Sequence, residues 1–179
     1  LLMQNLSNKN IPSTYWITGL SGAGKSTLLP YVVEKVNSFS NTKCIFFDGD
    51  NLRYIINIKT FDVQSRIENG LRYSRLCKYL NEQGHNVVIA CIGLYKEIHD
   101  WNKKNIPSLK YILLDVPVEE LIKRDPKGIY KNNLNSKVPN IVGIDIPAIY
   151  PDNPNIHFKW DLNMTKEKMI EYCIRQIED

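Results

Sequence analysis

Residues 19–27 read Gly-Leu-Ser-Gly-Ala-Gly-Lys-Ser-Thr and fit the pattern G-x-x-x-x-G-K-[ST] at Gly19, Gly24, Lys25 and Ser26. The glycines of this pattern let the backbone wrap closely around a triphosphate, so that successive N–H groups point at phosphate oxygens. We expect Lys25 to reach the β- and γ-phosphates and the Ser26 hydroxyl to coordinate Mg²⁺. The pattern therefore predicts a site for a nucleoside triphosphate.

The flanking residues supply the strand and the helix that such a loop needs. Tyr15-Trp16-Ile17-Thr18 predicts a short buried strand, and Ser26-Thr27-Leu28-Leu29 opens a helix. The N-terminus of that helix adds its dipole to the anion site. The alternative is a glycine turn that only resembles the motif, and the surrounding strand and helix argue against it.

Composition restricts the class of protein. A chain of 179 residues with 43% hydrophobic residues suits one domain with a sizeable core. The net charge of +4 fits an anionic ligand, but no basic run of the kind that binds nucleic acid is present. No signal peptide and no membrane-spanning apolar stretch is evident. We expect a cytoplasmic protein whose four cysteines are reduced and buried, namely Cys44, Cys77, Cys91 and Cys173.

Strand-like and helix-like segments alternate along the chain, which is typical of an α/β protein with a parallel sheet covered on both faces. Five strands are expected at 15–19, 44–48, 86–92, 110–116 and 156–160. Five helices are expected near 25–38, 65–83, 95–105, 118–124 and 165–178. The second helix carries a mostly apolar stripe at Ile67, Leu71, Ser74, Cys77, Lys78 and Leu80. Pro30 predicts a kink or an irregular turn early in the first helix.

The chain is expected to form one domain over residues 13–179, preceded by a flexible segment, 1–12. Residues 125–155 are rich in Pro, Asn, Gly and Lys and lack sustained periodicity. Long irregular segments inside a compact domain are usually functional, so this one is interpreted as a mobile lid.

Polar residues follow the second expected strand, in the run Asp48-Gly49-Asp50-Asn51-Leu52-Arg53. Carboxylates at the carboxyl end of a parallel strand face the crevice where ligands bind. Such a carboxylate can accept a proton from an attacking hydroxyl or hold water around Mg²⁺, and Arg53 could pair with a phosphate. The alternative interpretation is a solvated turn that caps a helix.

Taken together, these blocks resemble the adenylyl-sulfate (APS) kinase family from Trp16 to Phe158. Besides the glycine-rich loop and residues 48–53, the matching blocks are Arg66-Ile-Glu-Asn69, Arg124-Asp-Pro-Lys-Gly-Ile-Tyr-Lys131 and Gly143-Ile-Asp145. The resemblance implies a three-layer P-loop kinase fold with a five-stranded parallel sheet, a homodimer, and Mg²⁺ with ATP as donor. It also implies phosphoryl transfer to the 3′-hydroxyl of an activated nucleotide.

The resemblance also implies roles for individual residues. Asp50 matches the base that contacts the 3′-hydroxyl, and Lys25 is the second catalytic residue. Residues that match ATP-binding positions are Gly19, Leu20, Ser21, Gly22, Ala23, Gly24, Lys25, Ser26, Thr27 and Arg124, with Ser26 on Mg²⁺. Residues that match acceptor-binding positions are Asp50, Arg53, Phe61, Arg66, Asn69, Ile92, Gly93, Lys127 and Ile141.

Two departures bear on the acceptor. Gly93 stands where the family usually has a serine that is a phosphorylated intermediate in some members, which leaves direct in-line transfer. Ile141 stands where the family has a phenylalanine that, with the Phe61 equivalent, sandwiches adenine. Adenylyl sulfate is the first expectation, from the larger family. Cytidine diphosphoramidate is a nearly equal expectation. It is used by a divergent branch of the family that is linked to capsule polysaccharides.

Two other classes of protein also fit the glycine-rich loop. A P-loop regulator without an acceptor needs none of Arg66, Asn69 and Lys127, and a sugar or shikimate-type kinase should lack the Asp-Gly-Asp-Asn run. His85, His99 and His157 do not cluster with other candidate ligands and are interpreted as packing or surface residues, not metal ligands.

Overall fold

The computed structural model describes residues 11–125, 127–134 and 139–178. The expectation of flexibility for residues 1–12 therefore lies, for residues 1–10, outside the described residues, as do residues 126 and 135–138 of the expected lid. Throughout the described chain no helix is long and apolar enough to cross a membrane.

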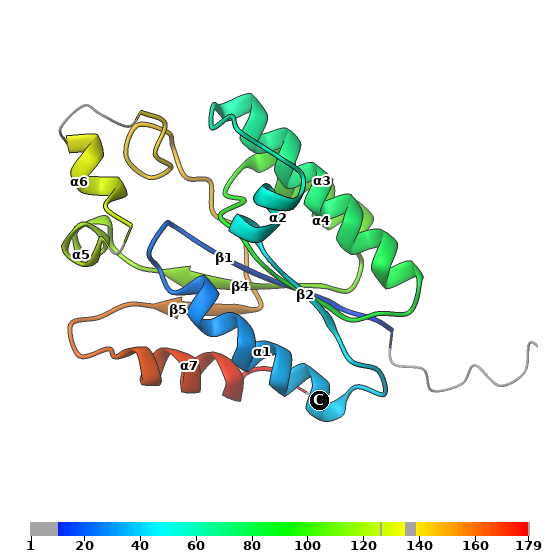
Figure 1. Cartoon of the computed structure of the whole chain (residues 1–179). Helices are drawn as coiled ribbons and strands as arrows, with labels where there is room; N and C mark the ends of the chain where they lie inside the picture. Colours follow the sequence, from blue (N-terminus) through cyan, green and yellow to red (C-terminus); the bar gives the residue numbers. More distant parts are fainter. Residues whose placement is uncertain (1–10, 126, 135–138, 179) are drawn as a thin grey trace, which may run out of the picture.

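The sheet has five parallel strands in the order β2-β3-β1-β4-β5. Their bounds are β1 Thr14–Gly19, β2 Ile45–Asp48, β3 Val87–Ala90, β4 Leu109–Asp115 and β5 Ile156–Lys159. The helices are α1 Lys25–Phe39, α2 Gly49–Ile55, α3 Val63–Glu82, α4 Lys96–Asn105, α5 Val118–Arg124, α6 Ile129–Leu134 and α7 Lys166–Arg175. Helices α1 and α7 cover one face of the sheet, and α3 and α4 cover the other (Figure 1). The predicted three-layer α/β fold with a five-stranded parallel sheet is confirmed.

Two short helices were not predicted from the sequence. Helix α2 begins where the Asp48 carboxylate caps it by accepting the N–H of Asp50 at 2.9 Å. Helix α6 lies inside the segment interpreted as irregular, and the Asp125 carboxylate accepts the N–H groups of Tyr130 and Lys131 at its start. Helix α2 has seven residues and helix α6 has six, and each begins beside a single carboxylate that accepts N–H groups of its first turn.

Helix α1 runs without a break from Lys25 to Phe39, so the irregular turn predicted at Pro30 is absent. The Pro30 ring lies on the exposed side of the helix. Proline has no backbone N–H, so the helix lacks one hydrogen bond at this residue. On this side the missing bond and the bend that it favours are next to water and not in the packed core.

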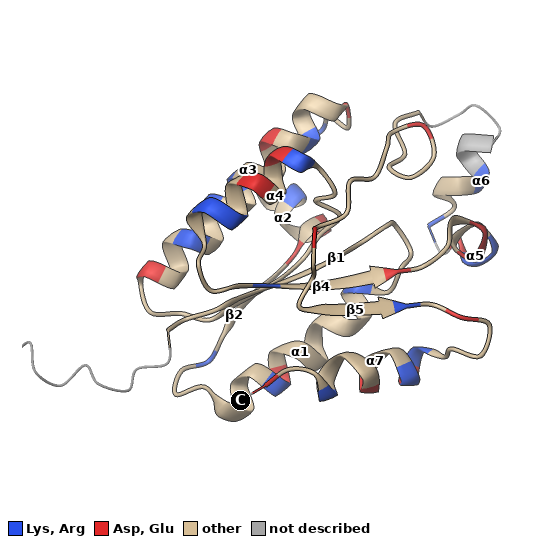
Figure 2. Ribbon diagram, turned by 180° about the vertical axis from the view of Figure 1, so that it is seen from behind, with Lys and Arg blue, Asp and Glu red and all other residues tan. Residues whose placement is uncertain are grey.

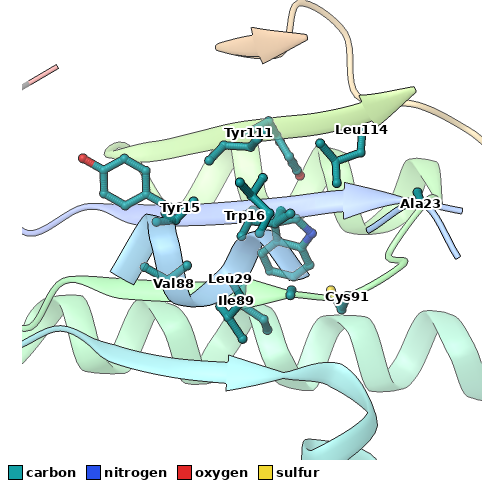
Figure 3. Close-up of a cluster of buried hydrophobic side chains, with 14 of the residues drawn as sticks. Tyr15, Trp16, Ala23, Leu29, Val88, Ile89, Cys91, Tyr111 and Leu114 are labelled. Carbon is teal, nitrogen blue, oxygen red and sulfur yellow. The ribbon is translucent and has the colours of Figure 1, made fainter. Parts of the chain in front are cut away.

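The core is built around Trp16, which is fully buried in the central strand β1. Its indole packs edge-to-face on Tyr111 of β4, with 6.3 Å between ring centroids. Leu29 of α1 and Ile89 of β3 belong to the same cluster (Figure 3). All four cysteines are buried and unpaired, as predicted.

The buried side of helix α3 carries polar as well as apolar residues. Within α3 the buried residues are Asn69, Gly70, Tyr73, Ser74 and Cys77. The predicted stripe is therefore shifted by part of a turn, because Ile67, Leu71 and Leu80 are only partly buried. The shift brings polar residues of α3 onto its inner face.

The outer faces of the helices carry mixed charges. Figure 2 shows basic and acidic residues interspersed along α3 and α7. Several form ion pairs one turn apart, including Arg72 with Glu68 and Arg175 with Glu171. Exposed pairs of this kind stabilise a helix by only about 0.3–0.5 kcal/mol each.

Candidate active site

The strand register brings three carboxyl ends together. Ala90 of β3 pairs with Ile17 of β1 on one side and with Asp48 of β2 on the other. The loop after β1, the start of α2 and residues 91–93 therefore meet at one edge of the sheet. In open parallel sheets this edge is where ligands bind.

The glycine-rich loop has the backbone conformation that its sequence predicts. Gly22 and Gly24 have φ values of 80° and 102°, in the left-handed region where glycine is favoured. Gly24 also caps α1, so the loop leads directly into a 15-residue helix whose N-terminus favours anions. The Lys25 ammonium group donates a hydrogen bond to the Leu20 carbonyl at 2.7 Å. This contact folds the lysine back over the loop.

Burial lowers the pKa of Lys25 to about 8, and the positive charge of Lys127 adds to this effect. The negative charges of Asp50 and Asp48 oppose it. At this pKa the Lys25 ammonium group is partly deprotonated near pH 8. A triphosphate placed on the loop would raise the pKa of Lys25 again, because an anion favours the charged form.

Ser26 and Asp48 form the part of the site that suits a divalent cation. The Ser26 hydroxyl donates to the Asp48 carboxylate at 2.5 Å. Magnesium prefers hard oxygen ligands and usually keeps several waters, so one hydroxyl and one nearby carboxylate fit it. The sequence prediction named only Ser26 as a metal ligand. Asp48 lay within the run considered for holding water around Mg²⁺, and in this structure it also caps α2.

Asp50 forms an ion pair with Lys127, which follows α5. Burial alone would raise the pKa of Asp50, but the hydrogen bond and charge of Lys127, together with Arg53 and Lys25, lower it below its ordinary value. Asp50 is thus an anion at neutral pH, able to accept a hydrogen bond from a hydroxyl. Two residues 77 positions apart in the chain are joined in this way.

A cavity of about 360 Å³, called here the first cavity, opens beside the glycine-rich loop. All nine predicted acceptor residues line it, namely Asp50, Arg53, Phe61, Arg66, Asn69, Ile92, Gly93, Lys127 and Ile141. The loop itself contributes Ser21, Gly22, Gly24, Lys25, Ser26 and Thr27. Residues predicted from separate blocks of the sequence are therefore brought into one place.

Arg66 ties together two walls of the first cavity. It donates to the Phe61 carbonyl at 2.7 Å and to the Asn140 carbonyl at 2.9 Å. The Phe61 ring also contacts the Arg53 guanidinium, which lies 4.6 Å from the ring centroid. The loop before Ile141 is further fixed because the Asp145 carboxylate accepts the N–H of Asn140 at 2.6 Å and that of Ile141 at 2.8 Å.

Other predicted residues have their polar groups engaged within the protein. The Asn69 side-chain oxygen accepts from Arg72 at 2.6 Å, and the Ile92 carbonyl accepts from the Thr18 hydroxyl. Gly19 and Leu20 lie at the base of the loop and line neither of the cavities described here. Their contribution is the turn itself and the carbonyl that holds Lys25.

A second cavity of about 370 Å³ lies on the other side of the loop. Gly22, Ala23, Gly24 and Thr27 line it, together with Arg124, Trp160, Lys166 and Met169. The Arg124 guanidinium lies over the Trp160 ring at 3.8 Å from the centroid, and its Nε donates to Glu120 at 2.8 Å. The glycine-rich loop therefore separates two cavities, each with a flat cationic side chain against an aromatic ring.

The sequence prediction missed Tyr130, whose hydroxyl donates to the Ser21 carbonyl of the glycine-rich loop at 2.8 Å. Its only signal in the sequence is its place within the 124–131 block. Two histidines make contacts within the protein: His99 bonds the Tyr111 hydroxyl and the Ile149 carbonyl, and His157 pairs with Asp115. Among the described residues no group of three or more His, Cys, Asp or Glu side chains could hold a metal ion.

Comparison with known proteins gives one consistent result. The sequence model of the adenylylsulphate kinase family matches residues 11–159. The chain belongs to the adenylylsulphate kinase family. A cytidine diphosphoramidate kinase from Campylobacter jejuni is 38% identical over 169 residues, covering 94% of this chain and 98% of the relative. An adenylyl-sulfate kinase from Clostridium kluyveri is 32% identical, covering 92% and 80%.

Solved structures agree with the family assignment. The APS kinase CysC of Mycobacterium tuberculosis, solved in complex with AMPPNP and APS, superimposes with a TM-score of 0.80 at 28% identity. The match covers 92% of this chain and 96% of that one.

The structure explains how this adenylylsulphate kinase family member accommodates Gly93. Its φ is 49°, and a Cβ added there would lie 3.2 Å from the Trp16 ring. A serine at this position would need both a left-handed backbone and a shift of the fully buried Trp16. Glycine at residue 93 and tryptophan at residue 16 are therefore structurally coupled.

Proposed function

We propose that this member of the adenylylsulphate kinase family transfers the γ-phosphate of Mg-ATP to the ribose 3′-hydroxyl of cytidine diphosphoramidate. The family makes the chain an ATP-dependent phosphotransferase acting on a nucleotide. The acceptor is the new element of the proposal. It rests on the first cavity and on the 38% identity to the Campylobacter jejuni enzyme.

One observation carries the choice of acceptor. Ile141 is 5% exposed, is fixed through Asp145, and lines the cavity where the family usually has a phenylalanine. A base between Phe61 and Ile141 stacks on one ring instead of two, and each lost base–aromatic contact removes about 1–3 kcal/mol. The smaller cytosine ring has less stacking surface to lose than adenine, so this pocket favours cytosine.

Adenylyl sulfate is the second candidate. The observations that favour it are the 32% identical Clostridium kluyveri enzyme and the retained set Arg53, Arg66, Asn69 and Lys127. These side chains suit any 5′-activated nucleotide with an anionic end. They therefore support an activated nucleotide as the acceptor, but they do not distinguish adenine from cytosine.

In the proposed reaction the donor base occupies the second cavity beside Arg124 and Trp160, and the triphosphate lies on the glycine-rich loop. Ser26, together with Asp48 through bound water, would hold Mg²⁺, which would supply positive charge to the phosphates of the donor. Lys25 stabilises the transferred group. Asp50 accepts a hydrogen bond from the attacking 3′-hydroxyl and takes its proton, while Arg53 and Lys127 hold the anionic end of the acceptor.

An assay of ADP release tests this proposal directly. The protein is incubated with Mg-ATP and, in separate arms, with cytidine diphosphoramidate, adenylyl sulfate, a hexose or no acceptor. We expect rapid ADP release only with an activated nucleotide, and a phosphorus NMR signal from a 3′-phosphate in the product. Equal release with and without acceptor would indicate a nucleotide-hydrolysing regulator instead.

We further propose that residues 125–155 act as a lid that closes over both nucleotides. The ion pair of Lys127 with Asp50 and the bond from Tyr130 to Ser21 support this, because they link the segment to the loop and to α2. Hydrogen exchange should show added protection of this segment when Mg-ADP and acceptor are present together. Exchange that is the same with and without nucleotides would exclude a closing lid.

The resemblance also leads us to propose a cytoplasmic homodimer. Tyr54 and Ile55 at the end of α2 are 87% and 70% exposed, which is consistent with a contact between chains. Light scattering on the purified protein should give twice the 20.8 kDa mass of the chain.

A further inference from the structure

Two tyrosine hydroxyls lie unpaired at the wall of the first cavity. Tyr73 of α3 and Tyr95, which precedes α4, both line the cavity, and each residue is only 6% exposed. Neither hydroxyl has a hydrogen-bond partner among the described residues. The Arg53 Nε atom, which belongs to the same cavity, is buried and unpaired as well.

Buried polar groups in native proteins are nearly always hydrogen-bonded, and leaving one unpaired costs free energy. Phenylalanine would fill the same space without that cost. Another tyrosine of the core follows the usual rule, because the Tyr111 hydroxyl is bonded to Asn102 at 3.0 Å and to His99 at 2.9 Å. The fold therefore gives no reason for the hydroxyls of Tyr73 and Tyr95, and a bound partner would.

Their positions connect them to different parts of the cavity. On α3 the residues Arg66, Asn69, Gly70 and Tyr73 follow one another at helical spacing, and all four line the cavity. Tyr73 lies within the electrostatic influence of Arg53, which is proposed to hold the anionic end of the acceptor. Tyr95 lies near Arg66, which holds the Phe61 wall.

The chemistry of the surrounding groups explains why hydroxyls are useful there. Lys25, Arg53, Arg66 and Lys127 can only donate hydrogen bonds. The carbonyl of Ile92 and the side-chain oxygen of Asn69 already accept from Thr18 and Arg72. The carboxylate of Asp50 is paired with Lys127 and is assigned to the attacking hydroxyl. Burial raises the pKa of both tyrosines, so at neutral pH each keeps a hydroxyl that can donate and accept.

We propose that Tyr73 and Tyr95 are specificity-determining residues for the acceptor, and that the Tyr73 hydroxyl accepts an N–H of its terminal phosphoramidate. This inference rests on the proposed function and deepens it. A phosphoramidate end carries an amino group that needs an acceptor, whereas a sulfate or phosphate end offers only oxygens. Tyr95, beside the Phe61 wall, contacts the base or ribose, which is common to cytidine nucleotides with different ends.

The test compares two acceptors that differ only at the end group, cytidine diphosphoramidate and cytidine diphosphate. In the wild-type protein we expect a higher kcat/KM for the phosphoramidate. Tyr73→Phe should reduce that preference about tenfold or more, since sites built to bond an N–H discriminate strongly. Tyr95→Phe should lower kcat/KM for both acceptors by a similar factor and leave the ratio unchanged. The KM for Mg-ATP should change less than twofold in both variants.

Thermal unfolding separates a role in recognition from a role in folding. Because the two hydroxyls are unpaired within the protein, Tyr73→Phe and Tyr95→Phe should keep or raise the Tm. The matched control, Tyr111→Phe, loses paired contacts and should lower the Tm with no change in the acceptor ratio. A Tyr73→Phe protein with a lower Tm and an unchanged ratio would overturn the proposal for Tyr73, and unchanged kinetics in Tyr95→Phe would overturn it for Tyr95.

Calorimetric binding in the presence of Mg-ADP repeats the comparison without turnover. If the wild-type protein binds and phosphorylates adenylyl sulfate instead of both cytidine nucleotides, the proposed acceptor is wrong. The phosphoramidate contact then falls with it. The affinity of Tyr73→Phe and Tyr95→Phe for adenylyl sulfate would then be measured. Unchanged affinity in both variants would show that neither hydroxyl takes part in acceptor recognition.

Discussion

At the scale of single residues, the site depends on how its cations and anions are paired. Lys25 is buried against the Leu20 carbonyl and Asp50 is held by Lys127. Burial lowers the pKa of Lys25. Burial alone would raise the pKa of Asp50, but the hydrogen bond and charge of Lys127 lower it, so that the carboxylate stays ionised. Both shifts lead to measurable predictions.

Triphosphate binding should be coupled to proton uptake by Lys25. With a pKa of about 8, Lys25 is half deprotonated at pH 8, and an adjacent triphosphate raises its pKa. Binding of a non-hydrolysable ATP analogue with Mg²⁺ should therefore take up about half a proton at pH 8 and almost none at pH 6.5. Calorimetry in buffers of different ionisation enthalpy measures this number. Lys25→Ala should abolish both the proton uptake at pH 8 and turnover. A proton uptake that persists in that variant would assign the proton to another group.

Asp50→Asn should depress kcat by about 10²–10⁴-fold, the usual range for loss of a general base, and leave Mg-ATP binding intact. A loss of Mg-ATP affinity with little change in kcat would place Asp50 on the metal instead. The pH profile gives a second measurement. Because Lys127 lowers the pKa of Asp50, Lys127→Met should move the acid limb of the kcat profile to higher pH.

At the scale of helices and strands, the alternating pattern predicted all five strands and the helices α1, α3, α4, α5 and α7. Residue type and period carry that information over many positions. Helices α2 and α6 could not be predicted in the same way, because they depend on single caps, Asp48 and Asp125, whose side chains could equally cap turns. The site residues were found from motif blocks. Tyr73 and Tyr95 were missed, because an unpaired hydroxyl becomes evident only when its surroundings are known.

The crossing of α3 and α4 sets the position of the acceptor residues on α3. Gly70 allows this crossing, because an added Cβ would lie 2.1 Å from the Ile98 side chain, which is fully buried. Gly70→Ala should therefore destabilise the protein by about 1–3 kcal/mol, the usual cost of overpacking. It should also raise the KM for the acceptor, since Asn69 and Tyr73 move with the helix. Thermal unfolding and steady-state kinetics check both effects, and a protein as stable as wild type would show that the Ile98 side chain moves aside at little cost.

At the scale of the whole molecule, the glycine-rich loop lies between two cavities of similar size. The loop glycines Gly22 and Gly24 line both. This arrangement suits a reaction in which a phosphoryl group passes between two nucleotides held on either side of one loop. Gly93 and Ile141, the two departures that the resemblance to the family implies, line the first cavity, and the proposed acceptor depends on that cavity.

The most direct test of this account is the ratio of kcat/KM for cytidine diphosphoramidate to kcat/KM for adenylyl sulfate, measured with saturating Mg-ATP. We predict a ratio above about one hundred, which corresponds to about 2.7 kcal/mol in transition-state binding. Ile141→Phe should lower the ratio by restoring the second ring. A wild-type ratio below one would contradict the account and show that a single aromatic wall suffices for adenine.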